Sequence, residues 1–190
     1  MHVGTHFFAG WLVSAMPGLT RGQRAAIALA GVAPDLDGVG LVAEFLTQDS
    51  ARPLLWYSDY HHVLGHNIGF ALVVTAVTYA LTHNRLVAVL AFASFHLHLL
   101  FDLAGSRGAD GHQWPIPYLQ PFSSVWQMTW SGQWFLGAWQ NTAITAVLLM
   151  ATVVVTWRFG YSPVGLISPR GDAVFVNALR GRFGAPHGAT

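Results

Sequence analysis

The chain has 190 residues, of which 53% are hydrophobic and only 9% are charged, with a formal net charge of +1. Soluble domains usually carry about 25% charged residues, so this composition excludes an ordinary water-exposed surface and indicates an integral membrane protein. The near-neutral charge and the lack of a basic patch argue against a nucleic-acid partner. The absence of cysteine excludes disulfides, thiolate metal sites and cysteine nucleophiles.

The first part of the chain holds apolar segments too short to cross a hydrocarbon core of about 30 Å unaided. They cover about 6–16, 24–33 and 38–46, and the last follows the motif "PDLD". Because backbone groups in lipid must be satisfied within their own segment, each is expected to be helical. They are predicted to be half-depth or buried helices packed against longer ones.

Three later segments are long enough to span a membrane, at about 66–82, 86–103 and 141–159. The predicted fold is therefore all-α, a polytopic membrane helix bundle with three spanning helices and two or three shorter ones. Residues 1–159 are expected to form a single membrane-embedded domain. Residues 160–190 are expected to form an arginine-containing, partly disordered cytoplasmic tail.

Arginine positions predict the orientation of this bundle. If consecutive segments alternate in direction, seven arginines gather at one end and only Arg52 and Arg107 at the other. By the positive-inside tendency the arginine-rich end is cytoplasmic. The opposite end, which carries the aromatic loops, would then face away from the cytoplasm.

Titratable residues converge on that non-cytoplasmic end. His66 and Asp102 are each 18 residues from the turn at Asn84, so they are expected at the same height on adjacent antiparallel helices. His98 lies four residues before Asp102 and shares its helical face. Topology brings further candidates to the same end, namely His6, Asp35, Asp37 and His61.

Imidazole and carboxylate groups without thiolate suit Zn²⁺, Mn²⁺ or Fe²⁺. The seven predicted metal ligands are His6, Asp35, Asp37, His61, His66, His98 and Asp102. One ion needs three or four protein ligands, whereas this number would suit two ions. The expected cofactor is thus one or two divalent ions, with zinc favoured.

Each of these residues also has a purely structural interpretation. His98 and Asp102 could form a neutral hydrogen-bonded pair, and "PDLD" could end one helix and cap the next. His96 points to another face than His98 and is expected to be structural. One of His61 and His62 is expected to be an ordinary interface residue. The remaining histidines have simpler expected positions: His83 at a solvated turn, His2 at a frayed terminus and His187 in the tail. His112 lies in a loop at the non-cytoplasmic end, and its role is left open.

Four motifs in order resemble one bacterial membrane family: "THFFAG", "APDLD", "HHVLGHN" and "HLLFD". It is the LexA-binding, inner-membrane-associated hydrolase family, also described as membrane-bound metal-dependent hydrolases. Its pattern of Thr-His, Pro-Asp-x-Asp, His-Arg-x-x-Thr-His-Ser, His-x-x-x-Asp and Trp-Pro falls within residues 1–122. The chain departs from this pattern at the third motif, where the family's Arg, Thr and Ser fall on His62, Gly65 and Asn67.

The resemblance implies a metal-dependent hydrolase in the inner membrane, and more distantly a likeness to zinc phospholipase C and P1 nuclease. We expect phosphoester hydrolysis, with a lipid as one candidate substrate, in which Asp35, Asp37 or His62 is the catalytic acid or base. Since the family's arginine is absent, Arg52 or Arg107 would contact the substrate, together with Trp114. The alternative is a non-enzymatic protein with a structural metal site, whose cytoplasmic face binds a protein partner.

Overall fold

The computed structural model describes residues 1–109 and 111–186, and this part of the chain is helical apart from loops and isolated bridges. In chain order its elements are α1 (Val3–Val13), α2 (Arg21–Ala30), the 3₁₀ helix η1 (Ala33–Val39), α3 (Gly40–Thr47), α4 (Trp56–Tyr60), α5 (Ile68–Thr82), α6 (Arg85–Gly105), α7 (Trp139–Phe159), the 3₁₀ helix η2 (Pro163–Leu166) and α8 (Pro169–Phe183). The all-α prediction is confirmed.

Two helices, α6 and α7, are long and apolar enough to cross a membrane. They confirm the segments predicted at 86–103 and 141–159. A third span exists only if α2 and η1–α3, which meet at a bend of 58°, are counted as one. The prediction of three spanning helices is therefore not confirmed for 66–82.

The helix expected at 66–82 is shortened at its start by its own cap. The Asn67 side chain accepts a hydrogen bond from the Phe70 N–H, and α5 therefore begins only at Ile68. It ends at Thr82 because His83 adopts a left-handed conformation (φ 48°). The 15 residues of α5 are too few to cross the hydrocarbon core. The helix is this short because the chain before Ile68 turns toward the candidate site.

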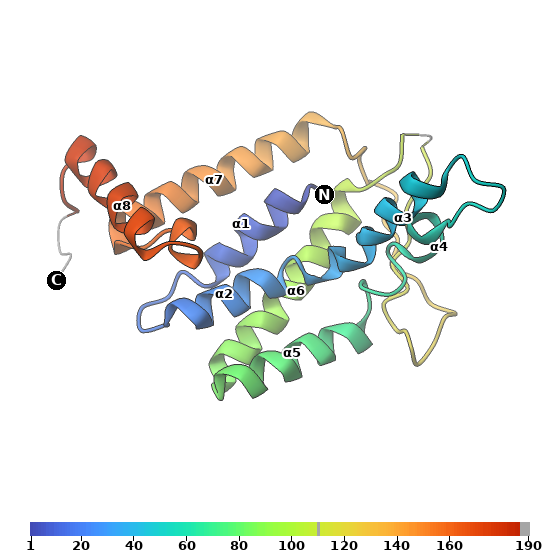
Figure 1. Cartoon of the computed structure of the whole chain (residues 1–190), viewed down its shortest axis with the longest axis horizontal. Coiled ribbons are helices and arrows are strands. Elements are labelled where there is room, and N and C mark those ends of the chain that lie inside the picture. The colour runs from blue at the N-terminus through green and yellow to red at the C-terminus, as the bar shows by residue number, and fades with distance from the viewer. Residues whose placement is uncertain (110, 187–190) are drawn as a thin grey trace.

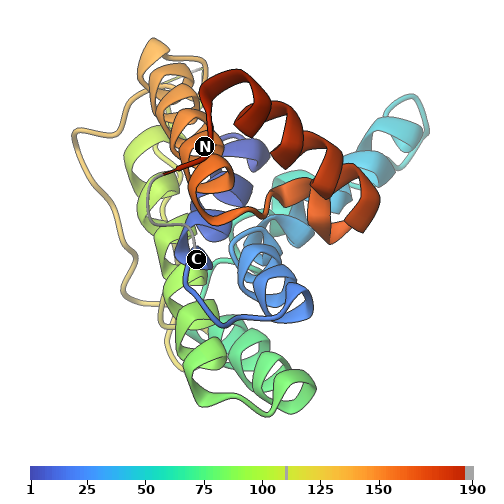
Figure 2. The same ribbon diagram turned by 90° about the vertical axis from the view of Figure 1, so that its left-hand side faces the viewer.

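Helix α6 is the centre of the bundle, since it packs against α1, α2 and α5. Its side chains Phe95 and Leu99 are fully buried with Ala71 of α5 and Ile116 of the long loop. In Figure 1 the α3–α4 region and that loop lie at one end of the bundle, and α8 lies at the other. Figure 2, viewed from the α8 end, shows α8 across the ends of the other helices.

Small residues let α1, α2 and α6 approach closely. A Cβ added to Gly10 would lie 2.7 Å from the Ser94 hydroxyl oxygen, and one added to Gly31 would lie 2.6 Å from the same atom. Such small-residue contacts are common where membrane helices pack. These contacts matter for the site because His6 lies one helical turn from Gly10 on α1 and His98 lies one turn from Ser94 on α6. The close approach of the helices therefore brings the two histidines together.

The stretch expected to be a partly disordered tail contains helices as far as it is described. The Ser168 side chain accepts a hydrogen bond from the Gly171 N–H at the start of α8, and Asp172 accepts bonds from the backbone and side chain of Ser162. These caps and the contact of α8 with α7 order the segment. Residues 187–190, with His187, lie outside the described residues.

Candidate metal centre

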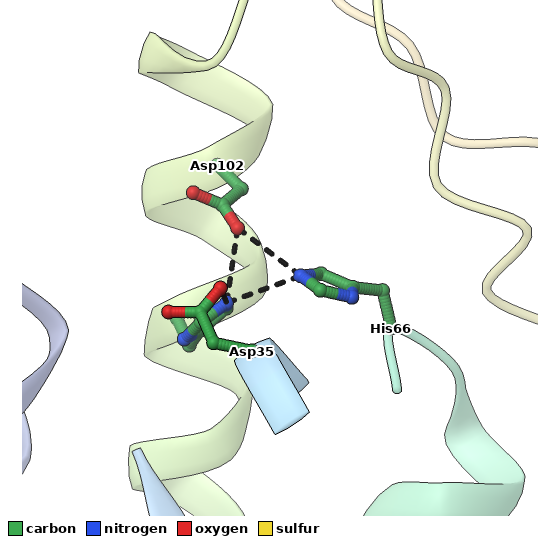
Figure 3. A group of neighbouring side chains, drawn as sticks. Asp35, His66 and Asp102 are labelled. Carbon is green, nitrogen blue, oxygen red and sulfur yellow. Dashed lines mark hydrogen bonds and ion pairs between the residues drawn. The ribbon is translucent and has the colours of Figure 1, made fainter. Parts of the chain in front are cut away.

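Four side chains from three separate stretches meet at the loop-bearing end of the bundle. His66, just before α5, and Asp35 of η1 face His98 and Asp102 of α6. One ligand atom from each lies within 4.8 Å of all the others. In Figure 3 the labelled side chains of Asp35, His66 and Asp102 point toward one another. Two imidazoles and two carboxylates are a donor set that suits zinc, manganese or ferrous iron.

The register predicted around Asn84 holds at the level of atoms. His66 Nε2 lies 3.3 Å from Asp102 Oδ2, and His98 Nε2 lies 2.9 Å from the same oxygen. Asp35 Oδ1 is 3.6 Å from His98 Nε2. The side chains of His66, His98 and Asp102 are at most 2% exposed, whereas Asp35 retains 16%. The cluster is thus buried, with Asp35 at its more open side.

Both histidines present their Nε2 atoms to the cluster because their Nδ1 atoms have other partners. His98 Nδ1 lies 2.8 Å from the Gly31 carbonyl oxygen, to which it can only donate. His66 Nδ1 lies 3.2 Å from Asp37 Oδ2, a carboxylate acceptor. In the neutral rings both Nε2 atoms then carry lone pairs, yet they lie 3.2 Å apart. A cation between them would remove the repulsion of two facing lone pairs.

Asp37, predicted as a ligand and as a catalytic group, lies outside this group of four. Its Oδ1 accepts from His61 Nδ1 at 2.7 Å, and its Oδ2 accepts from the Gly65 N–H at 2.9 Å. Together with His66 this makes three hydrogen bonds. The arrangement matches a carboxylate that orients a metal-binding histidine. His61 is likewise held at the edge of the cluster by Asp37.

Gly65 is needed where the resembled family has threonine. A Cβ at this position would lie 2.1 Å from the Pro34 carbonyl oxygen and 3.1 Å from Asp37 Oδ2. The loop before α5 can therefore press against η1 only because residue 65 has no side chain. This contact brings His66 to Asp37.

His6 approaches the second oxygen of Asp102. Its Nε2 lies 3.1 Å from Asp102 Oδ1, and its ring stacks on His98 with centroids 3.6 Å apart. Both ring nitrogens are buried without a hydrogen-bond partner. The Met1 nitrogen also contacts Asp102 Oδ1, and the Ser106 hydroxyl donates to this oxygen at 2.8 Å. His6 therefore lies beside the cluster, as predicted, and offers an unused nitrogen there.

His62 is held in a conformation that side chains rarely adopt. Its φ is 68°, and its ring stacks on His66 with centroids 4.1 Å apart. Its Nε2 lies 4.0 Å from Asp102 Oδ2, and its Nδ1 is buried without a partner. Burial and the neighbouring His66 hold the pKa of the His62 imidazole well below its usual value. Strained residues are often found at functional sites, and the unpaired Nδ1 marks His62 as a candidate for proton transfer beside the metal centre.

Two cavities open onto this end of the protein. One, of about 350 Å³, is lined by Asp35, Asp102 and Ser106, and the other, of about 460 Å³, by Val63, His112 and Gln127. Both share the side chains Tyr57, His61, His62 and Trp114. Trp114 thus lies where the sequence placed it, beside a space that could hold a substrate.

The two arginines predicted to contact the substrate line neither cavity. Arg52 is exposed in the loop between α3 and α4. Arg107 donates to the Ser131 carbonyl oxygen at 2.9 Å and lies over the Phe135 ring. Among the described residues, the linings contain no arginine or lysine, and the Met1 nitrogen in the smaller cavity is paired with Asp102. Histidines and any bound ion would therefore carry the positive charge available to a substrate.

The structural interpretation holds for three of the other histidines, His96, His83 and His2, whereas the sequence leaves the role of His112 open. His96 Nδ1 contacts the Phe92 carbonyl oxygen at 2.8 Å, and its Nε2 contacts the Tyr118 hydroxyl at 2.9 Å. His83 is exposed at the far end of α5, and His2 is exposed near the first helix. His112 lines the larger cavity.

Three contributors were not foreseen from the sequence. Ser106 follows Asp102 by four residues, a helical spacing that could have revealed its hydrogen bond. Tyr57 stacks on His61 with centroids 4.5 Å apart, and Gly31 supplies the carbonyl that orients His98. No sequence signal marks the last two, because a backbone acceptor and a ring contact depend on the packing of separate helices.

No protein-family model, no curated protein and no solved structure matches this chain. The resemblance to the LexA-binding, inner-membrane-associated hydrolases therefore stays an expectation that rests on the four sequence motifs.

Proposed function

We propose that this chain is a membrane-bound, metal-dependent hydrolase of phosphoesters, which acts on the non-cytoplasmic side of the inner membrane. One observation carries the proposal. The Nε2 atoms of His66 and His98 lie 3.2 Å apart, and carboxylate oxygens of Asp35 and Asp102 lie beside them. Zinc is the favoured ion because two imidazoles and two carboxylates suit its tetrahedral coordination.

Asp35, His66, His98 and Asp102 would hold the first ion, and His6 with the second oxygen of Asp102 could help hold another. When bound, such an ion lowers the pKa of a coordinated water and offsets negative charge on the phosphoryl oxygens. It would also add to the compensation of the buried Asp102 carboxylate, one oxygen of which already contacts the Met1 nitrogen and the Ser106 hydroxyl.

The protein's own residues would move the protons. A water oxygen forms a bond to phosphorus, the phosphorus–oxygen bond to the alcohol breaks, and His62 takes the water's proton and returns it to the leaving oxygen. His62 suits this role because it lines both cavities and its Nδ1 has no hydrogen-bond partner. Asp37 would orient His66 and His61, and Trp114 would form a wall of the substrate cavity.

Open cavities favour this function over a purely structural metal site bearing a partner-binding face. A structural site has four protein ligands and no position open to water. Here Asp35, the most exposed of the four candidate ligands, lines a cavity of about 350 Å³, so that water from the cavity could take its place or join as a fifth ligand. The first experiment measures hydrolysis of bis(p-nitrophenyl) phosphate by detergent-purified protein with added zinc. The control is the same wild-type protein without metal. Metal-dependent turnover, lost in His62→Gln with metal content unchanged, supports the proposal. Stoichiometric metal without turnover on any phosphoester would favour the structural alternative.

A further inference from the structure

An apolar groove runs along the outside of the bundle between α2 and α5. It has a volume of about 500 Å³, and its walls include Leu29, Val32 and Leu36 on one side and Phe70, Val74 and Leu81 on the other. Of the described residues that line it, Thr78 alone has a polar side chain. Figure 1 shows the two helices flanking α6, which packs against both of them.

This groove adjoins the polar cavity beside the metal centre through a second apolar groove, which shares one wall residue with each of them. Leu36 also lines a second apolar groove of about 500 Å³ beneath α3 and α4. Val39, which lines that second groove, also lines the polar cavity together with Asp35 and Asp102. One turn of 3₁₀ helix therefore presents a carboxylate to the polar cavity and a leucine to the apolar grooves.

The length of the groove fits one leaflet of a bilayer. Its α5 wall extends from Phe70 to Leu81, a rise of 11 residue steps that at ~1.5 Å each spans roughly 17 Å. Half of a hydrocarbon core of about 30 Å is close to this value. A single lipid chain that lies along the groove would thus end at the level of η1, next to the candidate metal centre.

The chemistry of the two spaces is that of an amphiphile. A hydrocarbon chain gains little free energy on leaving the bilayer for an equally apolar groove, since lipid tails are as apolar as leucine. The groove would instead fix the position of the headgroup relative to Asp35 and Asp102, which lowers the entropic cost of reaction. The described residues of the cavity linings include no arginine or lysine, and the Met1 nitrogen there is paired with Asp102, which agrees with recognition through the hydrocarbon chain rather than through the phosphate charge.

We propose that the substrate is a lipid phosphoester, one hydrocarbon chain of which lies between α2 and α5 while the phosphoester enters the polar cavity. This inference rests on the proposed function and names its substrate class. The lipid enters sideways from the bilayer, past Leu36, and does not need to leave the membrane.

A bulky residue in the groove tests the inference. Val77 lines the groove and is 51% exposed, so Val77→Trp can fill the space without disturbing the core. Val147→Trp on α7, at a residue 67% exposed, is the matched control outside the groove. Both variants should retain the wild-type metal content.

The first readout is independent of catalysis. A single-chain phosphocholine with a photoreactive diazirine on its chain is cross-linked to the purified protein, and the labelled peptides are mapped. We expect labels on α2 and α5, with a yield at least fivefold lower in Val77→Trp and unchanged in Val147→Trp. Labels spread evenly over all exposed helices, with equal yields, would mean ordinary surrounding lipid and would overturn the inference.

The second readout separates the substrate class from the proposed function. Hydrolysis of hexadecyl p-nitrophenyl phosphate should fall at least tenfold in Val77→Trp, while that of methyl p-nitrophenyl phosphate stays the same. If Val77→Trp leaves both rates unchanged, the chain-binding groove is refuted and the hydrolase stands. If metal-loaded wild type hydrolyses neither ester, both the function and the substrate assignment fail.

Discussion

Substitution of Asp37 by asparagine separates the orienting role of this residue from the role of a direct ligand. The carboxylate accepts three hydrogen bonds, from His61 Nδ1, the Gly65 N–H and His66 Nδ1. Asparagine has one acceptor oxygen in place of two, so at least one of these bonds is lost and His66 is less firmly oriented. Removal of such a supporting group typically lowers metal affinity about 10- to 100-fold, or roughly 1.4–2.7 kcal/mol.

The assay is zinc affinity of the detergent-purified protein, measured by competition with a chromophoric chelator. We expect Asp37→Asn to bind the same number of zinc ions as wild type, but 10- to 100-fold more weakly. The control is Asp59→Asn, which changes an exposed carboxylate of α4 outside the cluster and should leave the affinity unchanged. An unchanged affinity in Asp37→Asn, or a complete loss of bound zinc, would refute the orienting role.

Three further predictions concern stability. Gly65→Ala should lower the melting temperature and the zinc affinity together, because its Cβ would lie 2.1 Å from the Pro34 carbonyl oxygen. Overpacking of this kind costs about 1–3 kcal/mol of stability. The control is Gly22→Ala, whose Cβ would have no atom within 4 Å and should not destabilise the protein. His96→Phe should retain full zinc content but lose about 1–3 kcal/mol of stability, since it leaves the Tyr118 hydroxyl without its partner; loss of zinc would show that His96 belongs to the site. Zinc at 100 times its dissociation constant should stabilise the wild type by about 2.7 kcal/mol, measured as a rise in melting temperature that a chelator reverses, and an unchanged melting temperature would contradict binding to the folded state.

The part of the site that depends on helical geometry could be predicted from the sequence. His66 and Asp102 are equidistant from the turn at Asn84, and their ligand atoms lie 3.3 Å apart. His98 and Asp102 share a helical face through their spacing of four, and both join the cluster. In each case a regular rise per residue fixes the positions, so counting residues is sufficient.

The part that depends on irregular backbone could not be predicted. Asp35 and Asp37 are two residues apart in a 3₁₀ helix, and only the packing of the loop at Gly65 decides that Asp35 faces His98 while Asp37 faces His66. The start of α5 at Ile68 has the same origin, because Asn67 caps it where the loop leaves the site. Hydropathy alone placed the start of this helix at residue 66, whereas His66 belongs to the candidate metal centre and Asn67 caps the helix.

The helix at 169–183 shows a similar limit. Its scattered glycine, proline and arginine residues resemble disordered tails, yet Ser168 caps it and Asp172 ties it to Ser162. A single serine or aspartate at a helix end is a weak sequence signal. They become decisive only once α7 provides a surface against which the helix packs.

The most direct test of the central claim is the metal content of the detergent-purified protein, measured by elemental analysis. Wild type is compared with His98→Ala/Asp102→Ala and with His83→Ala, whose histidine is exposed at the other end of α5. The account predicts one or two equivalents of zinc or manganese in wild type and in His83→Ala, and none in the double variant. Wild-type protein that binds no metal when purified gently, or equal metal in all three proteins, would contradict it.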